Sequence, residues 1–160
     1  MTGYLMDTNH AAHWEHEFST GKDAEVITKL KSLPSETTIF GSVITLGEMW
    51  AGHEMTPSGD SRRRNQVENF LNICIIPTAI EVRASTRIYY GQILGRIWKA
   101  KPPAKSHIKT EKHLVEQLGI DINDVWIVAS AWEHGLILLT KDKLTQIKPL
   151  VTEVTYDCWI

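Results

Sequence analysis

The sequence predicts an α/β protein with a central parallel sheet of about four to five strands flanked by helices. Two observations favour one domain of this class. Short apolar runs alternate along the chain with longer segments of helical periodicity, as strands and crossover helices do. The 160 residues match the usual size of one domain, and no internal repeat, low-complexity tract or linker divides them. We therefore expect a single domain over residues 1–160.

The first third of the chain predicts two strands and two helices. Tyr4–Met6 is a short apolar strand. Asp23–Leu33 has helical periodicity, and Pro34 ends this helix because the proline ring cannot continue it. Thr37–Phe40 is β-branched and aromatic, which favours a second strand, and a helix from about Val43 to His53 follows.

The middle of the chain predicts a loop, two helices and a third strand. Met55–Gly59 contains Pro and Gly, which favours a loop. Ser61–Leu71 has a helical pattern, Ile73–Ile76 is an apolar run typical of a buried strand, and Ala79–Lys99 is one long helical pattern. The basic segment Lys101–Lys105 breaks this last helix because it contains two successive prolines.

The last third predicts two helices and two strands. Lys109–Leu118 and Asp124–His134 have helical patterns, and the glycine after each can adopt the left-handed conformation that ends a helix. Leu136–Leu139 is apolar throughout, which predicts a buried strand. Val151–Tyr156 predicts a final edge strand.

Composition excludes several classes of protein. With 42% hydrophobic and 22% charged residues, the chain is globular rather than disordered or fibrous. No uncharged run approaches the ~20 apolar residues of a membrane-spanning helix, and the N-terminus lacks the features of a secretory signal. We therefore expect a cytoplasmic protein with no membrane partner. Cys74 and Cys158 lack metal-ligand spacing and lie in apolar stretches, which favours buried free thiols.

Four acidic residues fall at comparable places in the predicted fold. Asp7 ends the first strand, and Glu48 lies in the helix after the second. Asp124 opens a later helix, and Asp142 comes shortly after the predicted strand Leu136–Leu139. Each alone could be a helix cap, a solvated residue or a turn residue. Because ligands of open parallel sheets bind outside the carboxyl ends of the strands, we expect all four to point into one cleft.

A cluster of four carboxylates requires a positive charge. Two like charges ~4 Å apart repel by about 4 kcal/mol at an effective dielectric constant of 20. Since no His or Cys stands in ligand spacing with these carboxylates, they favour a hard cation, Mg²⁺ or Mn²⁺, over Zn²⁺. Such an ion lowers the pKa of a bound water and neutralises charge on a phosphoryl group. The pattern therefore favours hydrolysis of phosphodiester bonds.

Basic residues concentrate in the middle of the chain. Between Arg62 and Lys112 there are eleven basic and three acidic residues, a net charge of +8, whereas the remainder carries −10. A basic surface would attract polyanions, although basic residues scattered over solvated helices would give the same count. The candidates for phosphate contacts are a basic run and a pair one predicted helical turn apart, namely Arg62, Arg63, Arg64, Arg83 and Arg87.

Four short motifs surround the acidic residues. They are, in chain order, Met6–Asn9, Ser42–Gly52, Asn123–Ala131 and Leu138–Asp142. Together they resemble the PIN domain, and within it the VapC/FitB-like toxins of bacterial toxin–antitoxin pairs. The Asp-Thr-Asn sequence alone is a weak signal, but four motifs in this order and spacing are a strong one. The resemblance extends to Val154–Trp159, which is similar to the short final strand of that group.

The resemblance implies an activity and partners. It implies a metal-dependent endoribonuclease that cleaves RNA, serves as the toxin of a toxin–antitoxin module, forms a homodimer and is neutralised by a small antitoxin protein. Asp7 and Asp124 would hold the Mg or Mn ion, and Asp142 would bind it directly or through water. Glu48 would complete the ligand set or orient the attacking water. The residues implied to fix these carboxylates are Thr8, Asn9 and Thr140.

Two features depart from the family pattern. The stretch from about Lys99 to Thr110 is longer than the equivalent link in typical toxins. Asp121 lies one helical turn before Asp124, and we interpret Asp121 as a helix cap because Asp124 directly heads the apolar helix.

Other functions fit parts of the pattern. An aspartyl-phosphate-type phosphatase would use Asp7 as its nucleophile, but Asn9 stands where such enzymes have a second Asp. Another nuclease role of a PIN domain, or a non-catalytic RNA-binding module, would keep the same fold. On a helix, His10, His13 and His16 are spread around the axis so that the three cannot close on one ion without distortion, and we expect them on a solvated face rather than at a metal.

Overall fold

The computed structural model describes residues 3–22, 25–57, 60–72, 79–105 and 107–160. Within these residues five parallel strands form one sheet in the order β3-β2-β1-β4-β5, which confirms the predicted α/β class. The strands are β1 (Gly3–Met6), β2 (Thr38–Ser42), β3 (Ala79–Ile80), β4 (Ile137–Leu139) and β5 (Tyr156–Asp157).

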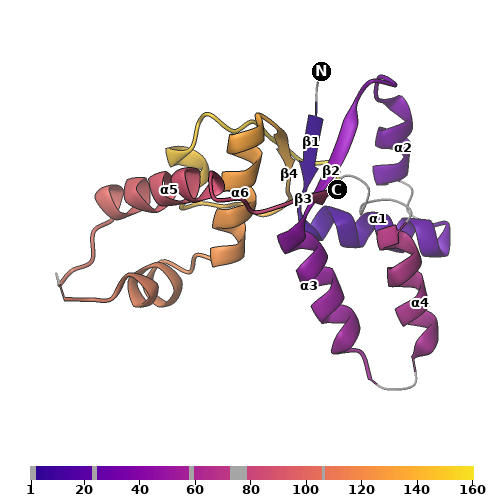
Figure 1. Ribbon diagram of the computed structural model, residues 1–160, viewed down its shortest axis with the longest axis horizontal. Coiled ribbons are helices and arrows are strands. Elements are labelled where there is room, and N and C mark those ends of the chain that lie inside the picture. Colours follow the sequence, from indigo (N-terminus) through magenta and orange to yellow (C-terminus); the bar gives the residue numbers. More distant parts are fainter. Residues whose placement is uncertain (1–2, 23–24, 58–59, 73–78, 106) are drawn as a thin grey trace.

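Helices cover both faces of this sheet. Figure 1 shows α5 and α6 on one side of the strands and α1 and α2 on the other. The helices are α1 (Thr8–Thr20), α2 (Glu25–Ser32), α3 (Val43–Glu54), α4 (Ser61–Phe70), α5 (Thr86–Ala100) and α6 (Ile122–His134). The described residues also include a short π-type helix (Lys112–Gln117) and a 3₁₀ turn (Lys148–Leu150). None of the helices in these segments combines the length and the apolar character needed to cross a membrane.

The two central strands divide the core between the two faces of the sheet. Leu5 of β1 and Leu138 of β4 pack with apolar residues of α5 and α6. The next residue of each strand, Met6 or Leu139, packs on the opposite face with residues of α1 to α4. Successive side chains of a strand point to opposite faces, so a sheet covered on both sides requires continuous apolar strands. All four side chains are at most 1% exposed.

The start of α3 is tied to the end of the central strand β1. Ser42 caps α3, and its hydroxyl oxygen accepts the N–H of Thr45 at 3.0 Å. The Thr45 hydroxyl donates to the carbonyl of Met6 at 3.3 Å. These bonds place the first turns of α3 beside the residue that follows β1, and they therefore bring Glu48 towards Asp7.

The helix α1 is not predicted by the sequence pattern. Polar residues obscure its pattern, because this helix buries His10, Glu15 and Glu17 on its inner side. Its ends are well specified, since Asp7 caps its first turn and Gly21 ends it in the left-handed conformation at φ 69°. Burial of hydrogen-bonded polar side chains thus replaces the apolar stripe by which a helix is recognised.

Of two predictions in the middle of the chain, one lies outside the described residues and the other is wrong. The predicted strand Ile73–Ile76 lies outside the described residues. Ala79–Ile80, predicted as the start of a long helix, is the edge strand β3, because it pairs with the last two residues of β2. The helix α5 begins only at Thr86, whose hydroxyl oxygen accepts the N–H of Arg83 at 2.9 Å.

The C-terminal third follows the predicted order with shifted boundaries. Gly119 and Gly135 adopt φ of 64° and 62°, which confirms the predicted left-handed ends of two helices. The last strand is Tyr156–Asp157 rather than Val151–Tyr156, because a 3₁₀ turn leads into Val151 and only the later residues pair with β4. Cys158 is exposed, so its predicted burial is wrong, and Cys74 lies outside the described residues.

Glu17 joins α1 to α2 through a buried cap, and its replacement by Ala is expected to destabilise the fold. The carboxylate is 0% exposed, and it accepts the N–H groups of Val26 and Ile27, each at 2.9 Å. Glu17→Ala leaves two donors of a helix start without a partner, so the free energy of unfolding should fall by about 3 kcal/mol. Urea denaturation measures this loss. The matched change at exposed Glu36, Glu36→Ala, should alter stability by less than about 0.5 kcal/mol.

Candidate active site

One cleft collects residues from the carboxyl ends of three neighbouring strands. Asp7 follows β1, Asp142 follows β4, and α3, which carries Glu48, begins at the end of β2. Asp124 lies in the first turn of α6. The cleft has a volume of about 550 Å³, and its lining contains Asp7, Thr8, Asn9, Glu48, Asp121, Asp124 and Asp142 with apolar Ala51, Met55 and Ile127. The structure thus brings together the four acidic residues that the sequence motifs singled out.

Asp7 is enclosed and held in a fixed orientation. It is 5% exposed, and its N–H donates to the carbonyl of Leu139 at 3.0 Å, which ties it to the end of β4. Its Oδ1 accepts the backbone N–H of His10 at 3.0 Å, and the ring Nδ1 of His10 lies 3.3 Å from the same oxygen. Both interactions engage Oδ1, so they leave Oδ2 for a ligand in the cleft.

Glu48 is held from two sides. The Thr8 hydroxyl donates to its Oε2, and the side-chain amide of Asn123 donates to its Oε1 at 2.7 Å. Thr8 belongs to α1 and Asn123 to α6, so the carboxylate is fixed between two helices that are far apart in sequence. These two hydrogen bonds therefore determine the orientation of the Glu48 carboxylate.

Asp142 is held by a side-chain amide at its carboxylate and by hydrogen bonds of its backbone. The Asn9 amide donates to its Oδ2 at 2.6 Å. The Asp142 N–H donates to the hydroxyl oxygen of Thr140 at 3.0 Å, and Lys148 Nζ donates to its carbonyl at 3.1 Å. Thr140 therefore positions the turn that carries Asp142 rather than the carboxylate itself.

The pKa of Asp124 reflects its burial and the negative charges around it. The pKa of its carboxyl is raised from 3.8 to about 7, first by burial and then by the negative charges of its acidic neighbours, namely Asp121, Asp142, Asp7 and Glu48. Near neutral pH this carboxyl is thus only partly ionised. A cation in the cleft would favour its ionised form and relieve the repulsion among the carboxylates.

The residues of the cleft fit a hard divalent cation by their chemistry. Their charged donors are carboxylate oxygens, which Mg²⁺ and Mn²⁺ prefer, and among the described residues no thiolate or imidazole lines the cleft. Across the described parts of the chain, no three His, Cys, Asp or Glu side chains form a ready-made metal-binding group. A cation at this site would therefore complete its coordination with water, as Mg²⁺ commonly does.

A family model of the PIN domain matches residues 4–146. The chain belongs to the PIN domain family. The match includes all four acidic residues of the cleft. A comparison with curated proteins gave no match.

Solved structures share the fold of this PIN domain. A chain of VapBC2 from Rickettsia felis, bound to a promoter DNA fragment, is 19% identical with a TM-score of 0.69, over 99% of this chain and 100% of that one. A chain of DNA-bound VapBC from Salmonella typhimurium is 18% identical with a TM-score of 0.68, over 100% of both chains. For FitAcB from Neisseria gonorrhoeae the identity is 21% and the TM-score 0.60, over 96% and 95%. At these identities the likeness shows the fold.

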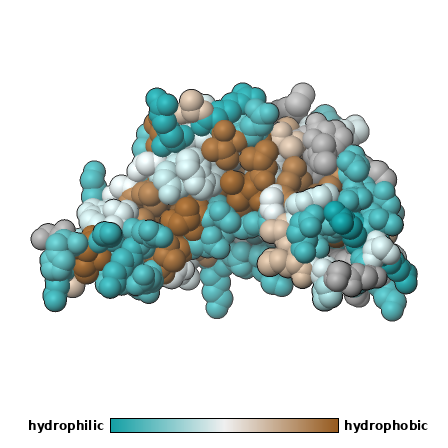
Figure 2. All heavy atoms as spheres, turned by 60° about the horizontal axis from the view of Figure 1, so that its bottom comes forward, coloured by the Kyte–Doolittle hydropathy of each residue, from teal (hydrophilic) through white to brown (hydrophobic). Residues whose placement is uncertain are grey.

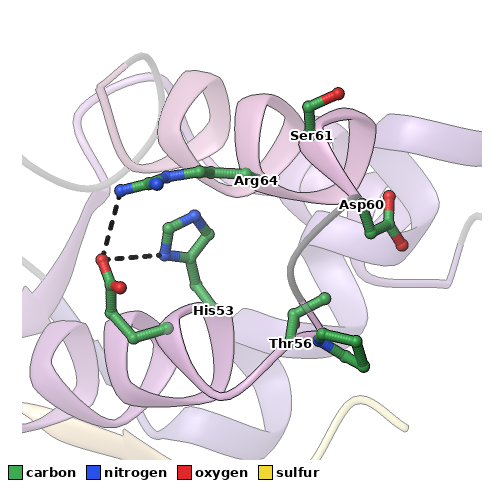
Figure 3. A pocket seen from close by; sticks show the side chains of 7 residues that line it. His53, Thr56, Asp60, Ser61 and Arg64 are labelled. Atoms are coloured by element: carbon green, nitrogen blue, oxygen red, sulfur yellow. Dashed lines mark hydrogen bonds and ion pairs between the residues drawn. The ribbon is translucent and has the colours of Figure 1, made fainter.

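Two arginines of the basic run on α4 of this PIN domain, Arg62 and Arg64, are not among the described residues that line the carboxylate cleft. Arg62 is exposed on α4, and the side chain of Arg63 lies outside the description. Arg64 pairs with Glu54 at 3.3 Å and with Glu68 at 3.6 Å. Figure 3 shows the side chain of Arg64 lying over the ring of His53. Both residues line a separate hollow of about 390 Å³ between α3 and α4. Any phosphate contact of Arg64 would thus compete with two carboxylates.

The second pair of arginines is not arranged as the sequence suggested. Arg83 precedes α5, so it does not lie one helical turn from Arg87, and that part of the prediction is wrong. Arg87 lines an open groove along α5 together with Arg96 and Lys99. This groove and the carboxylate cleft share no lining residue.

Sequence reasoning missed two residues of the site. His10 was expected on a solvated helix face, but it is 0% exposed and contacts Asp7. Asn123 was noted only as part of a motif, yet it holds Glu48. His10 follows Asp7 by three residues, the spacing of a helix cap, and this is the one signal that could have drawn attention to it. Asp121 is a helix cap as predicted, since it accepts the N–H of Asn123 at 2.8 Å, and it also lines the cleft.

Proposed function

We propose that this PIN domain is a Mg- or Mn-dependent endoribonuclease, acts in the cytoplasm and serves as the toxin of a toxin–antitoxin pair. The single observation that carries the proposal is the meeting of Asp7, Glu48, Asp124 and Asp142 in one cleft. Four carboxylates in one place oppose folding, as the raised pKa of Asp124 indicates. A site that keeps this repulsion is suited to bind a divalent cation beside a phosphodiester.

Each carboxylate has a separate task in this proposal. Asp7 and Asp124 would hold the ion, and Asp142 would hold it directly or through water. The ion supplies positive charge beside the phosphoryl group and a more acidic water. Glu48, fixed by Thr8 and Asn123, would orient the attacking water and accept its proton. The water oxygen then bonds to phosphorus as the bond from phosphorus to the leaving ribose oxygen breaks.

The surface also supports protein partners. Large apolar side chains remain exposed at Val43 and Trp50 of α3, at Met55 just after it and at Ile88 of α5. Figure 2 shows apolar side chains gathered in the middle of one face and flanked by hydrophilic ones. A contiguous apolar patch rimmed by polar residues is typical of a contact surface. The proposed partners are a second copy of the chain and a small antitoxin, and the likeness to VapBC and FitAcB chains supports the antitoxin.

The experiment that tests the proposed function is a cleavage assay. Structured and unstructured RNAs are incubated with the purified protein in Mg²⁺, in Mn²⁺ and in excess chelator. The proposal predicts internal cleavage with either metal and none with chelator. Release of inorganic phosphate from small phosphate esters without RNA cleavage would favour the phosphatase alternative, and RNA binding without cleavage would favour the non-catalytic one.

Asn123→Ala is expected to slow RNA cleavage about 10- to 100-fold, the usual effect of removing a partner that orients a site carboxylate. The reason is that Glu48 Oε1 loses the amide that holds it at 2.7 Å. Single-turnover rates at saturating metal measure the effect. The control is Asn69→Ala at an exposed position of α4, and equal rates for the two variants would show that Asn123 does not support the reaction.

A further inference from the structure

His10 lies between the carboxylate site and the C-terminal segment. It belongs to the first turn of α1 and is 0% exposed. Its ring Nδ1 is 3.3 Å from Asp7 Oδ1, and its Nε2 accepts the backbone N–H of Trp159 at 3.1 Å. One imidazole thus joins a carboxylate near the start of the chain to an amide near its end.

These two contacts determine the tautomer of the ring. A backbone N–H can only donate, so Nε2 must carry the lone pair that accepts it. A neutral imidazole with an unprotonated Nε2 carries its hydrogen on Nδ1. That hydrogen faces Asp7 Oδ1. An oxygen of an ionised carboxylate carries no hydrogen and can act only as an acceptor. Trp159 therefore selects the form of His10 that donates to Asp7.

The amide of Trp159 is itself held in place. Its indole ring packs edge-on against Tyr4 with 5.2 Å between ring centroids, and its indole N–H donates to Asp157 Oδ2 at 3.0 Å. The carbonyl of Asp157 accepts the N–H of Thr140 at 2.9 Å. Thr140 in turn accepts the N–H of Asp142. Residues 157–159 thus support the site at two points, at Asp7 through His10 and at Asp142 through Thr140.

We propose that His10 is a positioning residue for Asp7 and that Trp159 sets its tautomer. The Nδ1–H and the backbone N–H of His10 both engage Asp7 Oδ1, which turns Oδ2 towards the cation. Among metal-site residues, partners that orient a ligand in this way commonly change metal affinity 10- to 100-fold when removed. The part of the inference that concerns the cation rests on the proposed function.

The first test needs no metal. Nitrogen-15 NMR of the histidine rings in the metal-free protein, with His10 assigned by comparison with His10→Asn, reports which ring nitrogen carries hydrogen. The inference predicts a neutral His10 with hydrogen on Nδ1 and a bare Nε2. Hydrogen on Nε2 would overturn it.

The second test separates the two contacts of the ring. In His10→Asn the side-chain amide can take the place of Nδ1 and donate to Asp7, but nothing replaces Nε2. In His10→Gln the longer side chain can bring its amide oxygen to the position of Nε2, and the donor to Asp7 is lost. We expect Mn²⁺ affinity within about threefold of the parent for His10→Asn and a loss of about 10- to 100-fold for His10→Gln.

Controls distinguish this role from a structural one. His16 is exposed on the same helix, and His16→Gln should leave Mn²⁺ affinity unchanged. If His10 were only a packing residue, the Mn²⁺ affinity of the two His10 variants would change in parallel with their melting temperatures. It would not depend on whether a variant keeps the donor to Asp7 or the acceptor for the Trp159 N–H. Mn²⁺ binding by His10→Gln as tight as that of the parent would refute the role of His10 alone. A parent protein that binds no Mn²⁺ would instead refute the proposed metal centre.

Discussion

Asp7→Asn is expected to abolish metal-dependent RNA cleavage, with a loss on the order of 10³ or more. The variant replaces an anionic oxygen of the cleft by a neutral amide. The side chain keeps its shape, and an amide oxygen can still accept the N–H of His10 that Oδ1 accepts in the parent. The charge of the site therefore changes while the cap of α1 is retained.

The loss is measured as the single-turnover rate on RNA at saturating Mg²⁺ or Mn²⁺. Circular dichroism and urea denaturation verify that the variant is folded. Glu116→Gln, the same loss of charge at an exposed position, is the matched control and should cleave at the parent rate. If Asp7→Asn cleaved RNA as fast as the parent, the proposed site would be wrong.

Asp124→Asn is expected to stabilise the metal-free protein at neutral and alkaline pH while abolishing cleavage. The folded chain holds the pKa of Asp124 at about 7, above its ordinary value of 3.8. Below about pH 4 the carboxyl is protonated in both the folded and the unfolded chain, so it does not affect stability. Between about pH 4 and 7 the unfolded chain releases this proton first, and stability falls as pH rises. Above about pH 7 the penalty is complete.

The amide of Asp124→Asn has no charge and avoids this penalty. Because the parent carboxyl retains some contact with solvent, we discount the full shift and expect a gain of roughly 2 kcal/mol at about pH 8 and none at about pH 4. Urea denaturation in excess chelator at the two pH values measures the difference. Added Mg²⁺ should stabilise the parent and not the variant, since only the parent can bind the ion. A variant less stable than the parent at about pH 8 would contradict the proposed repulsion.

The class of the fold was predictable because it depends on patterns that extend along the chain. The apolar strand Tyr4–Met6 and the glycine-terminated helix that contains Asp124 are found close to their predicted places. The helix α1 was not predictable from an apolar stripe, because its inner side buries hydrogen-bonded polar groups. The two-residue strand β3 is too short for periodicity to reveal, and it exists because β2 lies beside it.

The acidic site could be predicted in outline and not in detail. The four carboxylates were recognisable from their places at one edge of a parallel sheet. Asp7 and Asp142 follow strands, Asp124 lies in the first turn of a helix, and Glu48 lies in the helix that begins where β2 ends. Partners such as Asn123 were not recognisable, because a bond to Glu48 joins residues 75 positions apart. His10 was misjudged for the same reason, since its second partner, Trp159, lies 149 positions along the chain.

The metal centre can be examined without RNA by calorimetric titration of Mn²⁺ into the metal-free protein at about pH 8, where Asp124 is mostly ionised. We expect saturable binding by the parent, through the carboxylates that meet in the cleft, and loss of that binding in Asp7→Asn and Asp124→Asn. Absence of binding by the parent would contradict the proposed metal centre. So would equal binding by the parent and both variants, because the ion would then be held elsewhere.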